Sequence, residues 1–266
     1  MNIQLLIINN IPQWEFILLL TVVIALFVIV TANIIHKFFP GVTHVDNQNL
    51  VYSMINVIST YYAVLMGFVI IVLWQAYSKA TVIVDTEASH LAIILRDSAV
   101  FPKVFHAQFS AAIGEYINNV MGDEWPAMQW GNISPLAEKS LEKIYTILQS
   151  FVPENDLQNT YYRDIITHLN SAMETRRQRI LAVDSILPDP LRVIMSVGAV
   201  GIPAFLALVE IRNKALHQFI IIVVSCILGF NLGFALNLDY PFSGKLKVSE
   251  APFTRGILAQ FQPKQT

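Results

Sequence analysis

Four long stretches without a charged residue constrain the fold of this chain most strongly. They cover residues 17–35, 55–73, 193–209 and 219–238. Each is close to the roughly 20 residues that a helix needs to cross about 30 Å of hydrocarbon. Because backbone groups in lipid must hydrogen-bond to one another, such stretches are expected to form helices. The sequence therefore predicts an all-α membrane protein with four transmembrane helices.

The composition supports this assignment and excludes several classes of protein. Charged residues make up only 14% of the 266 residues, compared with roughly 25% in soluble globular proteins. A formal net charge of −2 gives no basic surface for nucleic acid. The single cysteine, Cys226, excludes an intramolecular disulfide and a CxxC redox motif.

Motifs for chemistry are missing from the sequence. It contains no Walker A loop, no G-x-S-x-G and no G-x-G-x-x-G, and its six histidines lack metal-ligand spacing. We therefore predict that the chain is not an enzyme and that it has no catalytic residues, bound metal, cofactor or nucleic-acid partner.

The first apolar stretch is either a cleaved signal peptide or a retained span. No Lys or Arg precedes it, it is longer than a usual signal-peptide core, and no small-residue cleavage site follows. We expect it to be retained.

Most of the charged residues lie between the second and third stretches, which predicts an inserted lobe. We expect transmembrane helices 1 and 2 in residues 1–74, a helical lobe in 75–191, transmembrane helices 3 and 4 in 192–238, and a tail in 239–266. An even number of spans places both termini and the lobe on one side. Lys and Arg residues near the spans are more numerous on that side, so we predict that it is cytoplasmic.

Breaks by proline divide the lobe into expected helices. We predict helices over residues 79–99, 103–121 and 135–151, the third beginning with Ser134 as its N-cap. A last helix is expected to end near residue 186, before two prolines.

One face of the second transmembrane helix carries small and polar side chains. At roughly 100° per residue these side chains fall within a stripe about 100° wide. The stripe consists of Asn56, Ser59, Thr60, Ala63 and Gly67. The same face continues to Ile70 and Trp74, and then to Asp85 if the helix extends beyond the membrane.

Two interpretations of this stripe stay open. It lines a water-filled path with Ile70 and Trp74 as a hydrophobic neck and Asp85 at the cytoplasmic mouth. Alternatively, small residues let helices approach closely while amides and hydroxyls bond across the contact. The first interpretation requires a ring of several copies, because four spans scarcely enclose a path by themselves.

A basic cluster near the end of the lobe has two interpretations. Arg176, Arg177 and Arg179 either contact anionic lipid headgroups, or form a solvated face or ion pairs with Glu174 and Asp184. We favour the second interpretation, the solvated face or ion pairs.

Three further features are predicted to be structural. Ser225, Gly229 and Gly233 recur every four residues in the fourth span and form a packing face. Asp239 is expected to cap a turn or accept from a backbone amide of the lobe. Trp125 is expected to anchor a loop, with a position at the membrane surface as the alternative.

Several motifs together resemble one known family. They are residues 62–69 (YAVLMGFV) with 73–75 (LWQ), then 85–89 (DTEAS), 124–126 (EWP) and 238–244 (LDYPFSG). Over about residues 61–253 the chain resembles the bacterial membrane family DUF4239, often called bestrophin-like. The resemblance implies the plan of bestrophins, which are pentameric, mostly anion-conducting channels with a cytoplasmic helical lobe and a neck formed by the second span.

The chain departs from bestrophins at their acidic calcium-binding cluster, where Lys245 and Lys247 stand instead. Calcium activation therefore does not carry over with the resemblance.

These observations predict a homo-oligomeric, pentameric bestrophin-like ion channel in the bacterial inner membrane, with the second transmembrane helix lining the pore. Its partners would be copies of itself, the lipid bilayer and inorganic ions. The alternative is a membrane-anchored scaffold or sensor whose lobe binds a cytoplasmic protein.

Overall fold

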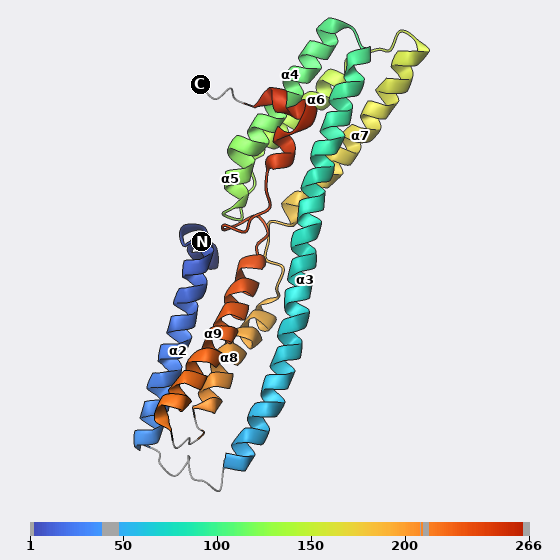
Figure 1. Cartoon of the computed structure of the whole chain (residues 1–266). Helices are drawn as coiled ribbons and strands as arrows, with labels where there is room; N and C mark the ends of the chain where they lie inside the picture. The colour runs from blue at the N-terminus through green and yellow to red at the C-terminus, as the bar shows by residue number, and fades with distance from the viewer. Residues whose placement is uncertain (1–2, 39–47, 208, 210–212, 263–266) are drawn as a thin grey trace. The chain divides into compact units, whose positions relative to one another are not determined.

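The computed structural model describes residues 3–38, 48–207, 209 and 213–262, and all regular structure in these ranges is helical (Figure 1). Four helices are long and apolar enough to cross a membrane. They are α2 (Gln13–Phe38), α3 (Gln48–Asp97), α8 (Asp189–Leu206) and α9 (Lys214–Leu238). The four predicted apolar helices are therefore confirmed.

The other helices are shorter or more polar. They are α1 (Ile3–Asn10), α4 (Lys103–Asn119), α5 (Trp125–Met128), α6 (Pro135–Gln149) and α7 (Asp156–Leu181), with a π-helical turn at Val120–Glu124 and 3₁₀ turns at Ser98–Val100, Ala251–Thr254 and Gly256–Phe261. The Ser134 hydroxyl accepts from the backbone amide of Leu136 (3.1 Å), which confirms the predicted N-cap of α6. α7 ends earlier than the predicted residue 186.

The chain divides into two compact units. The transmembrane unit consists of residues 7–75 and 185–240, and the lobe unit consists of 1–6, 76–184 and 241–266. The segment after α9 thus belongs to the same unit as the central helices. α3 is continuous, and contributes its first part to one unit and its second part to the other.

Small residues let α9 approach α2 closely in the transmembrane unit. A Cβ added to Gly229 would lie 2.9 Å from the Cα of Thr21, and one added to Gly233 would lie 3.4 Å from the Cα of Ile17. Ser225 on the same face is fully buried. The predicted packing face of the fourth span is therefore confirmed.

A second close approach joins α3 to α8. A Cβ added to Gly198 would lie 2.3 Å from the ring of Tyr62. The Tyr62 hydroxyl donates to the carbonyl oxygen of Met195 at 3.0 Å. A glycine is needed at position 198 because the tyrosine ring occupies the space of its side chain.

The lobe unit has a hydrophobic core that includes the C-terminal segment. Phe109, Ile144, Leu169 and Phe253 are fully buried and represent α4, α6, α7 and this segment. Trp125 is also buried, and its ring meets those of Phe242 and Phe253 edge-on at centroid distances of 5.6 and 6.0 Å. Trp125 is buried as an anchoring side chain, as expected, but it lies in α5 and not in a loop, and the alternative position at the membrane surface is wrong.

Two arginines of α7 enter this core with carboxylate partners. The Arg179 Nε atom lies 2.7 Å from the Glu87 Oε2 atom, and its Nη2 atom lies 2.8 Å from the Glu124 Oε1 atom. The Arg176 Nη2 atom lies 2.7 Å from the Glu124 Oε2 atom, and its Nη1 atom pairs with Glu138.

The favoured interpretation, a solvated face or ion pairs with nearby carboxylates, is confirmed in that Arg176 and Arg179 form ion pairs, but it is wrong about their partners. The carboxylates come from other helices, not from the nearby Glu174 and Asp184. Arg176 and Arg179 are buried, so the interpretation as a contact with lipid headgroups is wrong for both. Arg177 is exposed.

The ionisation of this cluster follows from its burial and its pairing. Burial lowers the pKa of Arg179, but the charge and hydrogen bond of Glu87, together with Tyr116 and Glu124, raise it more, so the net pKa lies above its usual range. The Tyr116 hydroxyl donates to the Glu87 Oε1 atom at 2.6 Å. Burial, and then the charge of Glu87, raise the pKa of Tyr116 well above 10.0.

We expect Arg179→Met to destabilise the lobe unit by about 3–5 kcal/mol, because it leaves Glu87 buried without its cation. The matched control is Arg177→Met, an exposed position on the same helix, where the change should stay within about 0.5 kcal/mol. Denaturant unfolding of the full chain in detergent, followed by tryptophan fluorescence, measures both. Equal effects of the two variants would contradict a stabilising network.

Tyr116 should make the lobe unit sensitive to alkali. Above a pH of about 10 the unfolded chain releases the Tyr116 proton. The folded chain retains this proton because its pKa is raised. The stabilising contribution is therefore complete below pH ~10 and falls by up to about 1.4 kcal/mol per pH unit above it. In Tyr116→Phe, the denaturant midpoint of unfolding should fall less steeply with rising pH than in the wild type. In the control Tyr161→Phe, the midpoint should fall as steeply as in the wild type.

Candidate functional site

The part of α3 within the transmembrane unit has one buried face. Tyr62, Met66, Val69 and Leu73 are buried and recur at helical spacing. This face contacts α8 through the hydrogen bond from Tyr62 to Met195. The buried face fixes the rotation of α3 within its own unit.

The small and polar stripe predicted from the sequence lies next to this buried face. Its members are Asn56, Ser59, Thr60, Ala63 and Gly67, of which Ser59 is half-buried and the others are exposed. The Thr60 hydroxyl donates to the carbonyl oxygen of Asn56 at 2.7 Å. A Cβ added to Gly67 would meet no atom within 4 Å. The described part of the chain therefore does not pack against α3 at Gly67, in contrast to Gly198, Gly229 and Gly233.

The rest of the surface of this part of α3 is bulky and apolar. Its exposed side chains include Val57, Tyr61, Val64, Phe68 and Ile71. α3 thus has two uncovered surfaces of different chemistry. The broad one carries large side chains suited to lipid, and the narrow one carries small and polar side chains.

Ile70 and Trp74 continue the narrow surface along α3. Ile70 is half-buried, and Trp74 is 56% exposed. Asp85 is exposed and lies about three helical turns after Trp74, in the part of α3 that belongs to the lobe unit. Since α3 is uninterrupted from Gln48 to Asp97, the predicted residues all belong to a single helix.

Asp239 lies directly after α9, at the end of the transmembrane unit. Its carboxylate is fully buried and accepts from the backbone amide of Leu187 (2.8 Å), the hydroxyl of Ser185 (3.0 Å) and Nη2 of Arg192 (2.8 Å). The bond to a backbone amide confirms the predicted structural role. The hydrogen bonds of Asp239 connect the end of α9 to the start of α8.

Sequence reasoning missed a pair of histidines in the lobe unit. The Nδ1 atoms of His90 and His168 lie 2.9 Å apart, so one ring donates and the other, which is neutral, accepts. His168 Nε2 also lies 3.9 Å from Asp164 Oδ1 on α7. The two histidines are 78 residues apart, a separation from which no spacing rule predicts contact.

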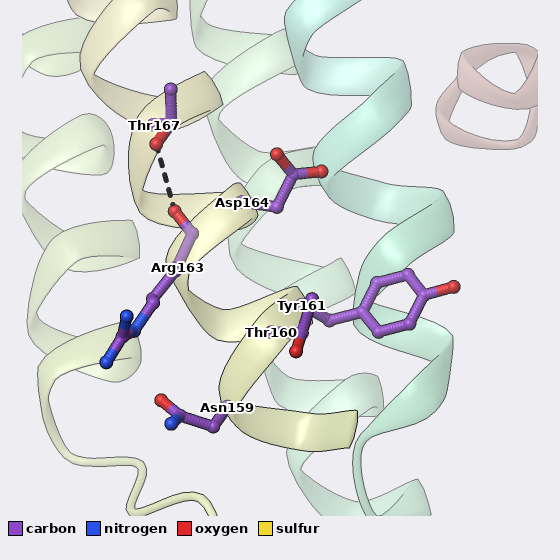
Figure 2. A pocket seen from close by; sticks show the side chains of 6 residues that line it. All are labelled: Asn159, Thr160, Tyr161, Arg163, Asp164 and Thr167. Carbon is purple, nitrogen blue, oxygen red and sulfur yellow. Dashed lines mark hydrogen bonds between the residues drawn. The ribbon is translucent and has the colours of Figure 1, made fainter. Parts of the chain in front are cut away.

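Asp164 also lines an open hollow of about 680 Å³ beside α7 (Figure 2). The six lining side chains in the figure all come from this helix, and Arg163 and Asp164 point to different sides of it. Within the described ranges, no group of three or more His, Cys, Asp or Glu side chains is placed to hold a metal ion.

Comparison with known proteins identifies the family. A family model described as Bestrophin-like domain matches residues 22–253, which include most or all of each apolar helix and the whole of α4 to α7. No curated protein and no solved structure matches the chain. The four apolar helices and this match together make the chain a multi-pass membrane protein. It belongs to the bestrophin-like domain family.

Proposed function

We propose that copies of this chain form a ring in the bacterial inner membrane and conduct inorganic ions along a path lined by α3. The observation that carries the proposal is the narrow surface of α3. It is small and polar, the described part of its own chain leaves most of it exposed, and it lies beside a broad apolar surface on the same helix. The bestrophin-like domain supports a channel-like membrane protein.

The side chains of the narrow surface are better suited to contact with water than to contact with lipid. An amide such as that of Asn56 is costly in hydrocarbon, where no solvent replaces its hydrogen bonds. Ala63 and Gly67 leave room beside the helix, and within the described residues a Cβ added to Gly67 would meet no atom within 4 Å. In a ring, the narrow surfaces of all copies would face the axis while the bulky side chains face lipid.

The ring is proposed to be a pentamer with its lobe unit and both termini in the cytoplasm. The subunit number follows the resemblance to bestrophins. The orientation follows the excess of Lys and Arg near the spans on the side of the lobe. The proposed activity is conduction without a catalytic step.

Along the proposed path, Ile70 and Trp74 form a hydrophobic neck and Asp85 forms a ring of carboxylates at the cytoplasmic mouth. A ring of large apolar side chains disfavours water and closes a narrow path by dewetting. The neighbouring residue on α3, Ile71, belongs to the bulky surface and is 53% exposed. Ile70 and Ile71 therefore give a matched pair of positions for the test.

Ile70→Ser should raise ion flux severalfold in liposomes that contain the purified full-length protein, because a hydroxyl at the neck favours water. Ile71→Ser makes the same substitution on the surface proposed to face lipid and should leave flux near the wild-type level. A dye-based flux assay, together with the mass of the assembly in detergent, measures both. Equal flux in the two variants would refute the neck, and a monomer that conducts nothing would favour the scaffold alternative.

The Asp85 carboxylates should determine whether the mouth favours cations or anions. Removing a ring of carboxylates with Asp85→Asn should shift the reversal potential in a salt gradient toward anions, because carboxylates attract cations and repel anions. Asp85→Glu keeps the charge and should keep the wild-type reversal potential. Planar-bilayer recordings measure the shift, and identical potentials in all three proteins would remove Asp85 from the path.

A further inference from the structure

The connection between α5 and α6 exposes large apolar side chains in the lobe unit. Trp130 is 43% exposed and Ile133 is 57% exposed, and Leu136 in the first turn of α6 is 47% exposed. We call residues 130–136 the apolar tip. Three such side chains within seven consecutive residues are unusual on a surface that faces only water.

The backbone of the apolar tip is held in place. The amides of Trp130 and Asn132 both donate to the carbonyl oxygen of Ala127, at 2.9 and 3.1 Å. Gly131 has a φ of +73°, a conformation that favours glycine. The hydroxyl of Ser134 caps α6 and also pairs with Asp123. The apolar side chains are thus presented by an ordered turn.

Two contacts within the lobe unit, one at Gln129 just before the apolar tip and one at Gly131 within it, connect this region to segments that lead into the membrane. On one side, the Ser243 hydroxyl donates to the carbonyl oxygen of Gln129 at 2.9 Å. α9 ends at Leu238, five residues before Ser243, and five residues span at most about 17 Å. This limit follows from the covalent chain alone.

The second contact comes from the other end of the chain. The position of a Cβ on Gly131 lies 3.5 Å from a methyl group of Leu5. Leu5 precedes Gln13, where the first apolar helix begins, by eight residues. With four spans, the start of the first and the end of the fourth lie on the same face of the membrane, so both connections lead to one surface.

We propose that the apolar tip inserts Trp130 and Ile133 into the interface between the headgroups and the acyl chains of the bilayer that the protein spans. Tryptophan favours this interface because its ring is amphipathic. Lys245 is exposed two residues after Ser243 and adds attraction to anionic headgroups. The tip anchors the lobe unit at the membrane surface, and the inference holds whether or not the protein conducts ions.

The test places a fluorophore at the tip of the full-length protein. In a Cys226→Ser background, Ile133→Cys and, separately, Trp130→Cys are labelled with an environment-sensitive dye and reconstituted in liposomes containing phosphatidylglycerol. Val152→Cys is the matched control, because Val152 is 78% exposed, apolar and located in another connection of the same unit. Quenching is measured with iodide in water and with lipids brominated near the headgroup.

The two tip labels should be quenched severalfold less by iodide than the Val152 label, and severalfold more by brominated lipid. Tip labels that iodide quenches as strongly as the control would overturn the proposal. Tip labels shielded from both quenchers would also overturn it, since they would lie against protein. Because all substituted side chains are exposed, folding of the variants is checked by an unfolding midpoint equal to that of the background.

Discussion

The structure depends on the buried residues that α3 contributes to each of the two units. Tyr62 and Leu73 are buried within the transmembrane unit, and Val84 and Leu91 are buried within the lobe unit. Within each unit such positions recur at helical spacing, so each unit fixes which side of its own part of α3 stays exposed. In the transmembrane unit this exposed surface includes Gly67. In the proposed channel, the same exposed surface would line the path through the membrane.

The buried charged side chains of the lobe unit determine how its helices pack against one another. Two arginines and two fully buried glutamates cancel in charge, so burying them costs desolvation without leaving a net charge. The Arg179 guanidinium lies over the ring of Trp125, 5.3 Å from its centroid, and near that of Phe253. A helix shifted by one turn would lose these contacts, because the shift leaves a buried ion unpaired. The network thus specifies how α3, α7 and the C-terminal segment meet.

The sequence was sufficient to predict the four apolar helices, because uncharged stretches of about 20 residues have few alternatives. It was also sufficient for the N-cap at Ser134 and the packing face at Gly229, since both depend on residues close in the chain. It was insufficient for the partners of Arg179, which come from α3 and from the π-helical turn before α5. It also missed the contact of His90 with His168 and the membership of Phe253 in the lobe core. These contacts join distant segments, and no local pattern encodes them. The role of the stripe on α3 stays a prediction, because it depends on neighbours outside one chain.

The arrangement of charge along α3 limits what each part of the proposed path can do. Between Asn56 and Trp74 the narrow surface carries no charge, so in the proposed path that stretch would distinguish ions only by the cost of dehydration. Asp85 is the first carboxylate after it, and at physiological ionic strength its field is screened beyond about 8 Å. The distance from Trp74 to Asp85 along α3 is about 16 Å at 1.5 Å per residue. In the proposed channel, the carboxylate ring would therefore act on ions at the mouth and scarcely on those in the neck. Selectivity and closure would reside in separate parts of one helix, so a change at Ile70 alters how easily the path fills without altering which ions enter it.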